Sequence, residues 1–491
     1  MPAPKLTLTH WLIIIIASLG FLFDTYQLLM TPLVGPAAIA ELLKVPLSNP
    51  AVTAWMGNLL WLSALSGGVF GLLGGWLTDR LGRKFVMALG IFVYSLSPVA
   101  GAFSHTLGEF IFWRCATFVG VCIEFVAAIT WIAEVFSDKA QKEKWLGITQ
   151  LFASLGGVFV TFVNFWILAH AKSLPHLGMP MALGAADPAS WRYLLLTGIL
   201  PALMIALMLP FVPESEVWRE RKRAGTLKRP SFAALFSPEL RRVTLVTAGI
   251  SACVYGVAFG ALQVTPGRVA PGLPDLAQQR KALKPLVDEA KTLNAAFDAT
   301  KPGSPERKAA LEPIKANSAK QKPIQDQVKE VGSKTQAYQE IGGLVGRIVL
   351  ALLVIMGIGR RLLLRLLQAP GLIILPLTYF MLYKQDAGVF CWGIAAAGFV
   401  TMSQLSFLGE YLPKVFPIHL RGTGGSFATN VGGRMIGTSA AFLVAQIAPM
   451  FKGSPYDQMA QAAGCVGLGA VVIGFILGMF LPEPKEQAAD F

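Results

Sequence analysis

The sequence predicts an all-α protein that crosses a membrane twelve times and is built from two related six-helix halves. The first observation is composition: 54% of the 491 residues are hydrophobic and only 14% are charged, which is more apolar mass than a soluble chain of this size buries. The second is a recurring apolar run of about 20 residues, the length that crosses a bilayer core of about 30 Å. The third is a set of charged junctions that occurs once in each half.

Twelve such runs follow one another along the chain. The predicted spans are 10–34, 52–77, 85–104, 107–133, 145–169 and 191–212, then 243–264, 339–358, 370–384, 387–412, 423–448 and 460–481. They divide the chain into a first half over 1–212, a central cytoplasmic loop over 213–242 with a surface helix, and a second half over 243–491. The first run is too long for a removable signal peptide, and no small-residue cleavage pattern follows it.

A hydrophilic insert over residues 265–338 has no counterpart in the first half. Hydrophobic residues recur in it at intervals of seven, which predicts one face of a helix; they are Leu276, Leu283, Ala290 and Phe297. After a turn, a second helix carrying Leu311 and Ile314 is expected, broken near Pro323. We expect an extracytoplasmic helical hairpin between spans 7 and 8, either a plain loop extension or a cap that binds an unknown partner.

Basic residues orient the chain. Placing the amino terminus in the cytoplasm puts most of them in cytoplasmic gaps, which is the usual bias; they are Arg80, Arg83, Lys84, Lys139, Lys142, Lys144, Arg360, Arg361, Arg365, Lys414 and Arg421. Both termini are therefore predicted to be cytoplasmic. Topology and lipid headgroups account for the formal charge of +14, so no nucleic-acid partner is expected.

Cysteine and histidine give no sign of a metal, a cofactor or an enzyme. The five cysteines all fall inside predicted spans, and the five histidines are scattered. No metal-ligand spacing and no catalytic constellation can be formed from them. We expect small apolar fillers at the cysteines.

The two halves repeat one another. A shift of 277 residues places GRK (82–84) on GRR (359–361), each after the second span of its half. A glutamate followed by basic residues ends the fourth span in 132–147 and again in 408–424, and both halves end in Pro-Glu-Ser or Pro-Glu-Pro. A duplicated six-span bundle favours a substrate site between the halves near the bilayer midplane, reached by alternating access.

GWLTDRLGRK (75–84) matches every defined position of the G-x-x-x-D-[RK]-x-G-R-[RK] loop motif of the Major Facilitator Superfamily. The PESEVW segment and the pattern of Glu410 followed by Arg421 also resemble the sugar porters of that superfamily. The resemblance covers the whole chain except 265–338. It implies a twelve-span carrier and a latch in the motif loop.

The motif residues predict a contact that opens and closes. Asp79 is expected to pair with Arg83 or with an arginine of span 11, helped by the charged end of a neighbouring helix, and the glycines allow close helix approach. The predicted cytoplasmic gate consists of Gly75, Asp79, Arg80, Gly82, Arg83, Lys84, Glu134, Glu410 and Arg421. Topology alone explains Arg80 and Lys84, but not Asp79. In the second copy Met356 stands where the aspartate would be, so a second latch of the same kind is not expected.

Ionisable residues inside spans are costly and mark functional sites. Arg114, Arg347 and Arg434 are predicted at membrane depth with only two carboxyl groups, Asp24 and Glu124. Because arginine stays protonated, an anionic substrate would restore neutrality, and guanidinium binds a carboxylate through two hydrogen bonds. Buried carboxyl groups can exchange a proton near neutral pH, so Asp24 and Glu124 are the predicted proton-coupling residues.

Family resemblance adds two roles. Arg347 is similar in placement to the substrate-anchoring arginine of monocarboxylate transporters, and the organic-acid and sialate symporters that the chain resembles carry an acidic group in span 1, as Asp24 does here. In the structural alternative, Arg114 pairs with Glu124 and Arg434 serves the latch. Other polar residues at plausible depth bind substrate hydroxyls or join helices: Tyr26, Gln27, Asn164, Gln404 and Asn430.

The expected function is proton-coupled symport of a small organic anion, such as a monocarboxylate, an aromatic acid or an acidic sugar. A neutral-sugar porter, an exporter working by antiport, and a receptor-like sensor that binds without transport remain alternatives. Partners are expected to be the substrate, protons and lipid. We expect a monomer in the inner membrane of a bacterium.

Overall fold

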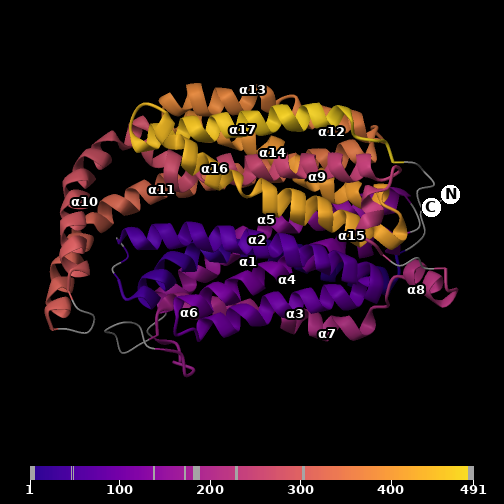
Figure 1. Ribbon diagram of the computed structural model, residues 1–491, viewed down its shortest axis with the longest axis horizontal. Coiled ribbons are helices and arrows are strands. Elements are labelled where there is room, and N and C mark those ends of the chain that lie inside the picture. Colours follow the sequence, from indigo (N-terminus) through magenta and orange to yellow (C-terminus); the bar gives the residue numbers. More distant parts are fainter. Residues whose placement is uncertain are drawn as a thin grey trace.

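The computed structural model describes residues 6–45, 47, 49–136, 139–170, 173–180, 188–226, 230–300 and 305–484. Within these residues, twelve helical segments are long and apolar enough to cross a membrane, as the sequence predicts. They form two bundles that lie side by side along the long axis, the first half in indigo to magenta and the second in pink through orange to yellow (Figure 1). The molecule is therefore an all-α membrane protein.

The first half contains the helices up to residue 211, in chain order. They are α1 (Leu8–Leu43), α2 (Pro50–Leu81), α3 (Arg83–Ala102), α4 (Leu107–Val135), α5 (Lys139–His170), and a sixth span made of α6 (Ser190–Leu196), η2 (Thr197–Ile199), α7 (Leu200–Met208) and η3 (Leu209–Phe211). The short helix α8 (Glu216–Arg223) follows in the central loop. Large apolar side chains such as Phe162 and Leu207 lie exposed on the outer surface, as expected for residues that face lipid.

The second half has more interrupted spans. Its first span joins α9 (Arg241–Tyr255) to η5 (Gly256–Leu262) and η6 (Thr265–Val269), and its third joins α12 (Arg360–Gln368), α13 (Gly371–Pro376) and η9 (Leu377–Met381). The others are α11 (Pro305–Ile355), α14 (Ala387–Val415), the chain of α15 (Arg421–Ser426), η12 (Phe427–Gly437) and α16 (Ala440–Ile447), and α17 (Pro455–Met479). The π-helical stretch η12 is notable, because such insertions often occur at functional sites.

Both ends of the described chain lie at one end of the bundle. Near the start of α1, the ring of His10 lies 5.3 Å from that of Phe136, which follows α4. Beyond α17, the carbonyl of Leu481 accepts a hydrogen bond of 2.8 Å from Arg361. This end also holds the turn at Gly82, where φ is +112° and α2 passes into α3. We call it the gate end; it is the end that the charge bias predicts to be cytoplasmic.

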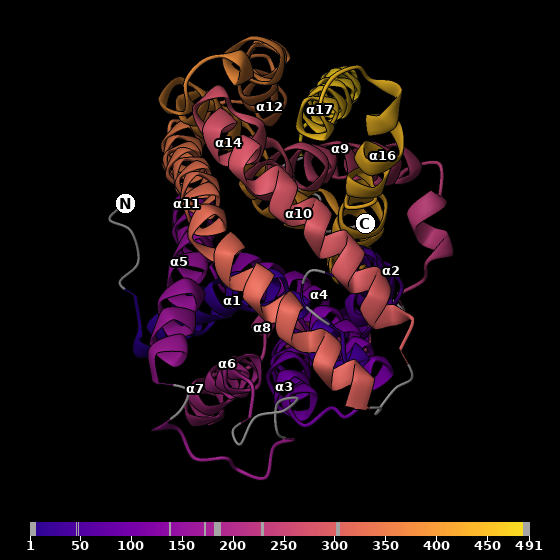
Figure 2. The same cartoon turned by 90° about the vertical axis from the view of Figure 1, so that its left-hand side faces the viewer.

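The insert forms a helical hairpin at the opposite end. Helix α10 (Ala277–Asp298) packs on the first part of α11, and the pair crosses the end of the bundle diagonally (Figure 2). Phe297 and Ala290 of the predicted stripe are buried, while Gln321 donates to the carbonyl of Leu286 at 3.1 Å and Asn317 to Glu289 at 2.7 Å. The location of this hairpin outside the cytoplasm stays a prediction.

One expectation about the insert is wrong. The predicted break near Pro323 does not occur, because α11 runs unbroken for 51 residues through both Pro313 and Pro323 into the span predicted at 339–358. A proline in a helix interior costs about 3 kcal/mol. The ring of Pro323 is exposed. The residues of α11 on either side of Pro323 pack against α10, and this packing offsets the lost backbone hydrogen bond.

Candidate functional site

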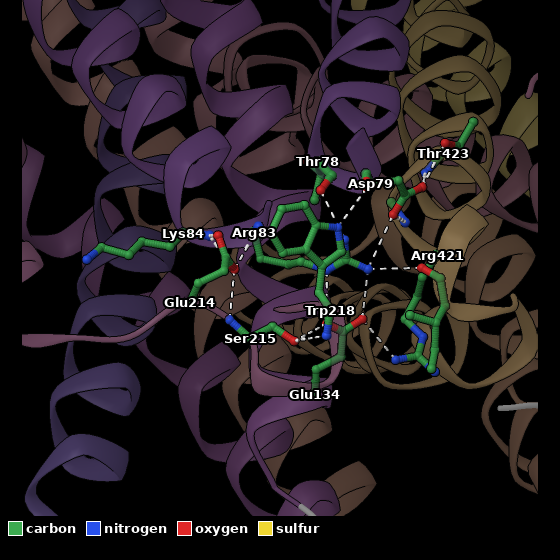
Figure 3. A network of polar contacts seen from close by, with 12 residues as sticks. Thr78, Asp79, Arg83, Lys84, Glu134, Glu214, Ser215, Trp218, Arg421 and Thr423 are labelled. Carbon is green, nitrogen blue, oxygen red and sulfur yellow. Dashed lines mark hydrogen bonds and ion pairs between the residues drawn. The ribbon is translucent and has the colours of Figure 1, made fainter. Parts of the chain in front are cut away.

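Asp79, at the end of α2, binds the start of the α15–η12 helix in the other half. Its carboxylate accepts hydrogen bonds from the backbone N–H of Gly422 at 2.9 Å, and from the N–H and the hydroxyl of Thr423, both at 2.7 Å (Figure 3). The first N–H groups of a helix have no partner inside the helix and carry partial positive charge. The Arg83 guanidinium is farther away, at 3.5 Å. The helix start is therefore the main partner of Asp79.

Arg83 and Glu134 form a second, fully buried part of this network. The Nε and Nη2 atoms of Arg83 donate to the two carboxylate oxygens of Glu134 at 2.9 and 3.0 Å. Nη2 also donates to the carbonyl of Ile418 in the second half at 2.9 Å. From that half, Arg421 reaches Glu134 at 3.0 Å. The predicted gate residues thus join the two halves by paired charges as well as by the Asp79 contact.

Gly75 allows α2 to approach α15 closely. A Cβ atom at this position would lie 2.5 Å from the carbonyl oxygen of Gly422 and 3.0 Å from Oγ of Ser426. In the same region the Ser426 hydroxyl donates to the carbonyl of Gly71 at 2.6 Å. A larger residue at Gly75 would separate the two halves at the gate end.

The central loop contributes residues that were not in the predicted set. Glu214 accepts hydrogen bonds from the backbone N–H groups of Arg83 at 2.9 Å and Lys84 at 3.1 Å, the first residues of α3. Ser215 donates to Glu134 at 2.6 Å. Trp218 donates to the carbonyl of Asp79 at 2.9 Å. The PESEVW segment held the signal, because acidic and hydroxyl groups directly follow the sixth span.

Two predicted gate residues lie at the edge of the network. Arg80 is exposed, with its guanidinium 4.9 Å from the ring centre of Trp76. Lys84 takes part through its backbone N–H, and its side chain points away from the other labelled groups (Figure 3). Topology explains these two cations, as the sequence indicated.

The second half repeats the intra-half part of the network without the aspartate. Arg360 donates to Glu410 at 2.9 Å, and Lys414 also bonds this carboxylate. Glu483 accepts from the backbone N–H of Arg360 at 3.0 Å and of Arg361 at 2.7 Å, as Glu214 does in the first half. Met356, which replaces the aspartate, is 72% exposed. Asp79 therefore has no counterpart at this position.

A second cluster of charges lies farther from the gate end. Asp24 of α1 and Glu124 of α4 interact electrostatically with each other and with Arg434 of η12. Arg434 follows Arg421 by thirteen residues, or about 20 Å of helix. All three side chains are buried. Among the described residues, the four carboxyl oxygens have no hydrogen-bond partner outside this pair of acids. The cluster joins two acids of one half to one guanidinium of the other.

Arg434 is held by its own helix and by α4. Its Nη1 atom donates to Oδ1 of Asn430 at 2.9 Å, and the amide nitrogen of Asn430 donates to the carbonyl of Cys122 at 3.2 Å. The guanidinium carbon lies 5.2 Å from the ring centre of Phe125 and 5.9 Å from that of Phe118, within the range of cation–π attraction. Cys122 and both phenylalanines belong to the first half, so the boundary between the halves passes through this cluster.

The other two predicted arginines do not join these carboxyl groups. Arg114 donates to the carbonyl of Gln27 at 3.0 Å and to the hydroxyl of Thr31 at 2.5 Å, and therefore ties α4 to α1. The alternative of an Arg114–Glu124 ion pair is not found among the described contacts. Arg347 lies 4.0 Å from Sδ of Met402 and interacts electrostatically with Glu340 on its own helix. Three guanidinium groups were expected to meet at these carboxyl groups, but the described contacts place only that of Arg434 there.

Of the five predicted polar residues, Asn430 alone has a described contact within the Arg434 cluster. The Tyr26 hydroxyl bonds Thr197 at 2.5 Å, and Gln27 donates to the carbonyl of Gly198 at 3.4 Å. Gln404 donates to the carbonyl of Val400 at 3.1 Å. Asn164 is half-buried on α5. Tyr26 and Gln27 therefore join α1 to the sixth span, and Gln404 bonds its own helix.

A family model described as the Major Facilitator Superfamily matches residues 8–280. The chain belongs to this superfamily. Its homologues and its fold are those of membrane transporters and not of enzymes. The motif loop and the repeat had indicated the same family.

The names of two relatives of this superfamily member give different transported substances. The glucose transport protein of Synechocystis is 33% identical over 153 residues, which is 31% of each chain. The niacin transporter NiaP of Acinetobacter baylyi is 26% identical over 211 residues, 42% of this chain and 41% of that protein. The matches thus cover only 31% and 41% of the length of these two relatives.

Solved structures of superfamily members share the fold along nearly the whole chain. The proton:xylose symporter XylE of E. coli, bound to 6-bromo-6-deoxy-D-glucose, superposes with a TM-score of 0.63 at 16% identity and covers 97% of both chains. FucP in the outward conformation gives 0.63 at 14% identity, covering 97% of this chain and 99% of that one. At these identities the likeness concerns the fold alone.

In a superfamily member, the contacts between the halves define the conformation. Here the hydrogen bonds that cross the boundary run from Arg83 and Ile418 at the gate end to Asn430 and Cys122 next to the charge cluster. Alternating access requires such contacts to break and re-form. The structure therefore has its gate end closed.

Proposed function

We propose that this protein is a proton-coupled symporter for a small organic anion that carries a carboxylate. The observation that carries the proposal is the buried cluster in which Asp24 and Glu124 of one half oppose Arg434 of the other. A substrate that binds at the boundary of the halves can be exposed to either side by rocking one half against the other.

Charge balance in this cluster supports proton coupling. Two ionised carboxylates against one guanidinium would leave a net negative charge in a buried site, which is costly unless it is compensated. A proton on Asp24 or Glu124 makes the cluster neutral. This differs from the surplus of positive charge expected from the sequence, because Arg114 and Arg347 have their described contacts elsewhere.

The same balance links the proton to an anion. A substrate carboxylate that bonds Arg434 takes the place of Asp24 or Glu124 as its counter-ion. The released carboxylate then needs a proton of its own to stay buried at low cost. Binding of one anion is therefore accompanied by uptake of one proton. The name of the niacin transporter, whose cargo is a pyridine carboxylic acid, is consistent with this cargo class.

The test is uptake of radiolabelled nicotinate and benzoate by purified protein in proteoliposomes. An inward proton gradient should accelerate uptake, and a protonophore should remove the acceleration. Arg434→Gln should abolish acid uptake, and Asp24→Asn should make the remaining uptake insensitive to the gradient. Lys291→Gln, at an exposed position of α10, is the control. Acid uptake that persists in Arg434→Gln would refute the proposal.

A neutral-sugar porter is the second candidate. The glucose transport protein among the relatives and the sugar symporters among the folds favour it. A sugar carrier should take up glucose or xylose and should tolerate Arg434→Gln far better than an acid carrier. Counterflow of labelled substrate separates both from a sensor that binds without transport, and efflux from preloaded vesicles against a gradient would identify an exporter.

A further inference from the structure

We infer that the transported anion is an aromatic carboxylate, with its ring placed among phenylalanine and tyrosine side chains while its carboxylate bonds Arg434. This inference rests on the proposed function and narrows its substrate class. It is carried by the aromatic residues around Arg434, which faces Asp24 and Glu124.

The first group of rings belongs to α1 and α4. Phe118 and Phe125 are seven residues apart, which places them on one face of α4 about 20° from each other. Both rings lie within 6 Å of the Arg434 guanidinium carbon, at 5.9 and 5.2 Å. Phe21 of α1 contacts Phe125 edge to face, with ring centres 5.7 Å apart. A ring entering beside Arg434 from this side would meet aromatic partners.

The second group belongs to the other half. Tyr255 lies close enough to Arg434 for electrostatic interaction, and its ring stacks on that of Phe259 with centres 5.9 Å apart and planes 9° apart. Tyr255 is partly buried at the end of α9. Aromatic side chains of both halves therefore approach the same guanidinium, so a flat ring would be in contact with each half.

The buried hydroxyl of Tyr94, which interacts electrostatically with Asp24 and Glu124 and has no hydrogen-bond partner among the described residues, could bond one substrate hydroxyl. Few other described groups at this point could do so. The amide of Asn430 already accepts from Arg434 at 2.9 Å and donates to Ser426 at 2.8 Å. The amides of Gln27 and Gln404 bond backbone carbonyls away from the cluster. A site that selects a sugar needs several placed polar groups, whereas an aromatic acid needs one anion partner and offset or edge-on ring contacts. The surroundings of Arg434 fit the second requirement.

The experiment compares benzoate with cyclohexanecarboxylate, which has the same carbon skeleton and charge without an aromatic ring. Each acid competes with labelled nicotinate for uptake into proteoliposomes. We expect benzoate to compete between about twofold and tenfold better, the range of ratios that an aromatic contact provides. Phe125→Leu should reduce that ratio toward one. Phe162→Leu, at an apolar position exposed on α5, should leave it unchanged.

The outcomes separate this inference from the proposed function. If both acids compete equally, the aromatic preference is refuted while acid symport stands. If no acid is transported and a sugar is, the proposed function fails. Because the measured quantity is a ratio of two acids in one preparation, lower expression of a variant does not change it. Should Phe125→Leu not fold, Phe118→Leu is measured in the same way, and an unchanged ratio there contradicts the inference.

Discussion

Gly20 shows how the absence of one side chain positions a carboxyl group on another helix. It lies on α1, and a Cβ atom there would come within 3.1 Å of Cδ of Glu124 and closer still to Oε1. Glycine in a helix interior is less favourable than alanine by about 1 kcal/mol. The close approach gives this position a reason to be glycine, because it lets the Glu124 carboxyl group lie against α1 beside Asp24.

Gly20→Ala should displace the Glu124 carboxyl group, since a flexible side chain yields before two packed helix backbones do. We expect proton-driven uptake to fall at least tenfold, while the apparent melting temperature changes little. Gly57→Ala on α2, where a Cβ would meet nothing within 4 Å, is the matched control. Wild-type coupling in Gly20→Ala would show that the position of this carboxyl group does not matter.

Asp79→Asn should weaken closure of the gate end. The amide keeps the size of the side chain but removes the charge that three donors of Gly422 and Thr423 share, and hydrogen bonds to a charged group contribute roughly 1.5–3 kcal/mol each. Spin labels at Arg80 and Met356, both exposed, should report a broader and longer distance distribution. Glu216→Gln, exposed on α8, should leave the distribution unchanged. An unaltered distribution in Asp79→Asn would contradict the assignment.

Depth along a helix could be predicted from the sequence, but the direction of a side chain could not. Arg114 and Glu124 are ten residues apart, so they point about 80° away from each other on α4, and Arg114 reaches the carbonyl of Gln27 instead of the central carboxyl groups. Asp79 was identifiable because topology does not explain an acid among basic residues. Tyr255 gave no signal, because an aromatic residue in an apolar span looks like any packing residue.

At the level of helices, the repeat is preserved most clearly in how α3 and α12 begin. Glu214 and Glu483 each accept the first backbone N–H groups of one of these helices. Such contacts satisfy donors that no residue within the helix can reach, and they place a negative charge at the positive helix end. The Pro-Glu pattern after spans 6 and 12 therefore marks a shared structural role that the sequence comparison detected without explaining.

Glu214→Gln and Glu483→Gln should each destabilise the protein, by about 1 kcal/mol for a lost helix-start contact. Glu214→Gln should lower the free energy of unfolding more than Glu483→Gln, because Glu214 is only partly exposed and Glu483 is exposed. Thermal unfolding in detergent measures both. Since the two helix starts lie in different halves, the double variant should be additive within about 0.5 kcal/mol. Strong non-additivity would show that the two helix starts are coupled.

Helix boundaries were the weaker part of the prediction. Span 8 was expected to begin at residue 339, but α11 begins at Pro305 and includes the second arm of the hairpin. Judged from the local sequence alone, Pro313 and Pro323 favour a break in the helix. The buried amides of Asn317 and Gln321 between α10 and α11 are tertiary contacts, which no local pattern reports.

At the scale of the molecule, twelve spans and the family were predictable from composition, apolar run length and the motif loop. What could not be predicted is which charges meet across the boundary of the halves, because that depends on how two bundles are rotated against each other. Asp24 with Arg434 and Asp79 with Thr423 are both contacts of this kind. The first connects the proposed proton and anion sites, and the second holds the gate end closed.

The unbroken α11 has a mechanical consequence. Its 51 residues form a rod of about 76 Å. One end of the rod is a membrane span of the second half, and the other end carries α10 across the first half at the end opposite the gate end (Figure 2). A rod without a hinge transmits any tilt of that span to its tip, and the sweep grows with distance from the pivot. Each transport cycle should therefore move α10 relative to the first half at this end.

Pulsed spin-label measurements can detect this sweep. A pair at Lys291 and Ile341, both exposed along the rod and its partner helix, should keep a constant separation when substrate and acid are added. A pair at Lys291 and His105, which is exposed between α3 and α4, should change its separation. If the separation of the first pair changes as much as that of the second, α11 bends and the motion of the hairpin is not coupled to the transport cycle.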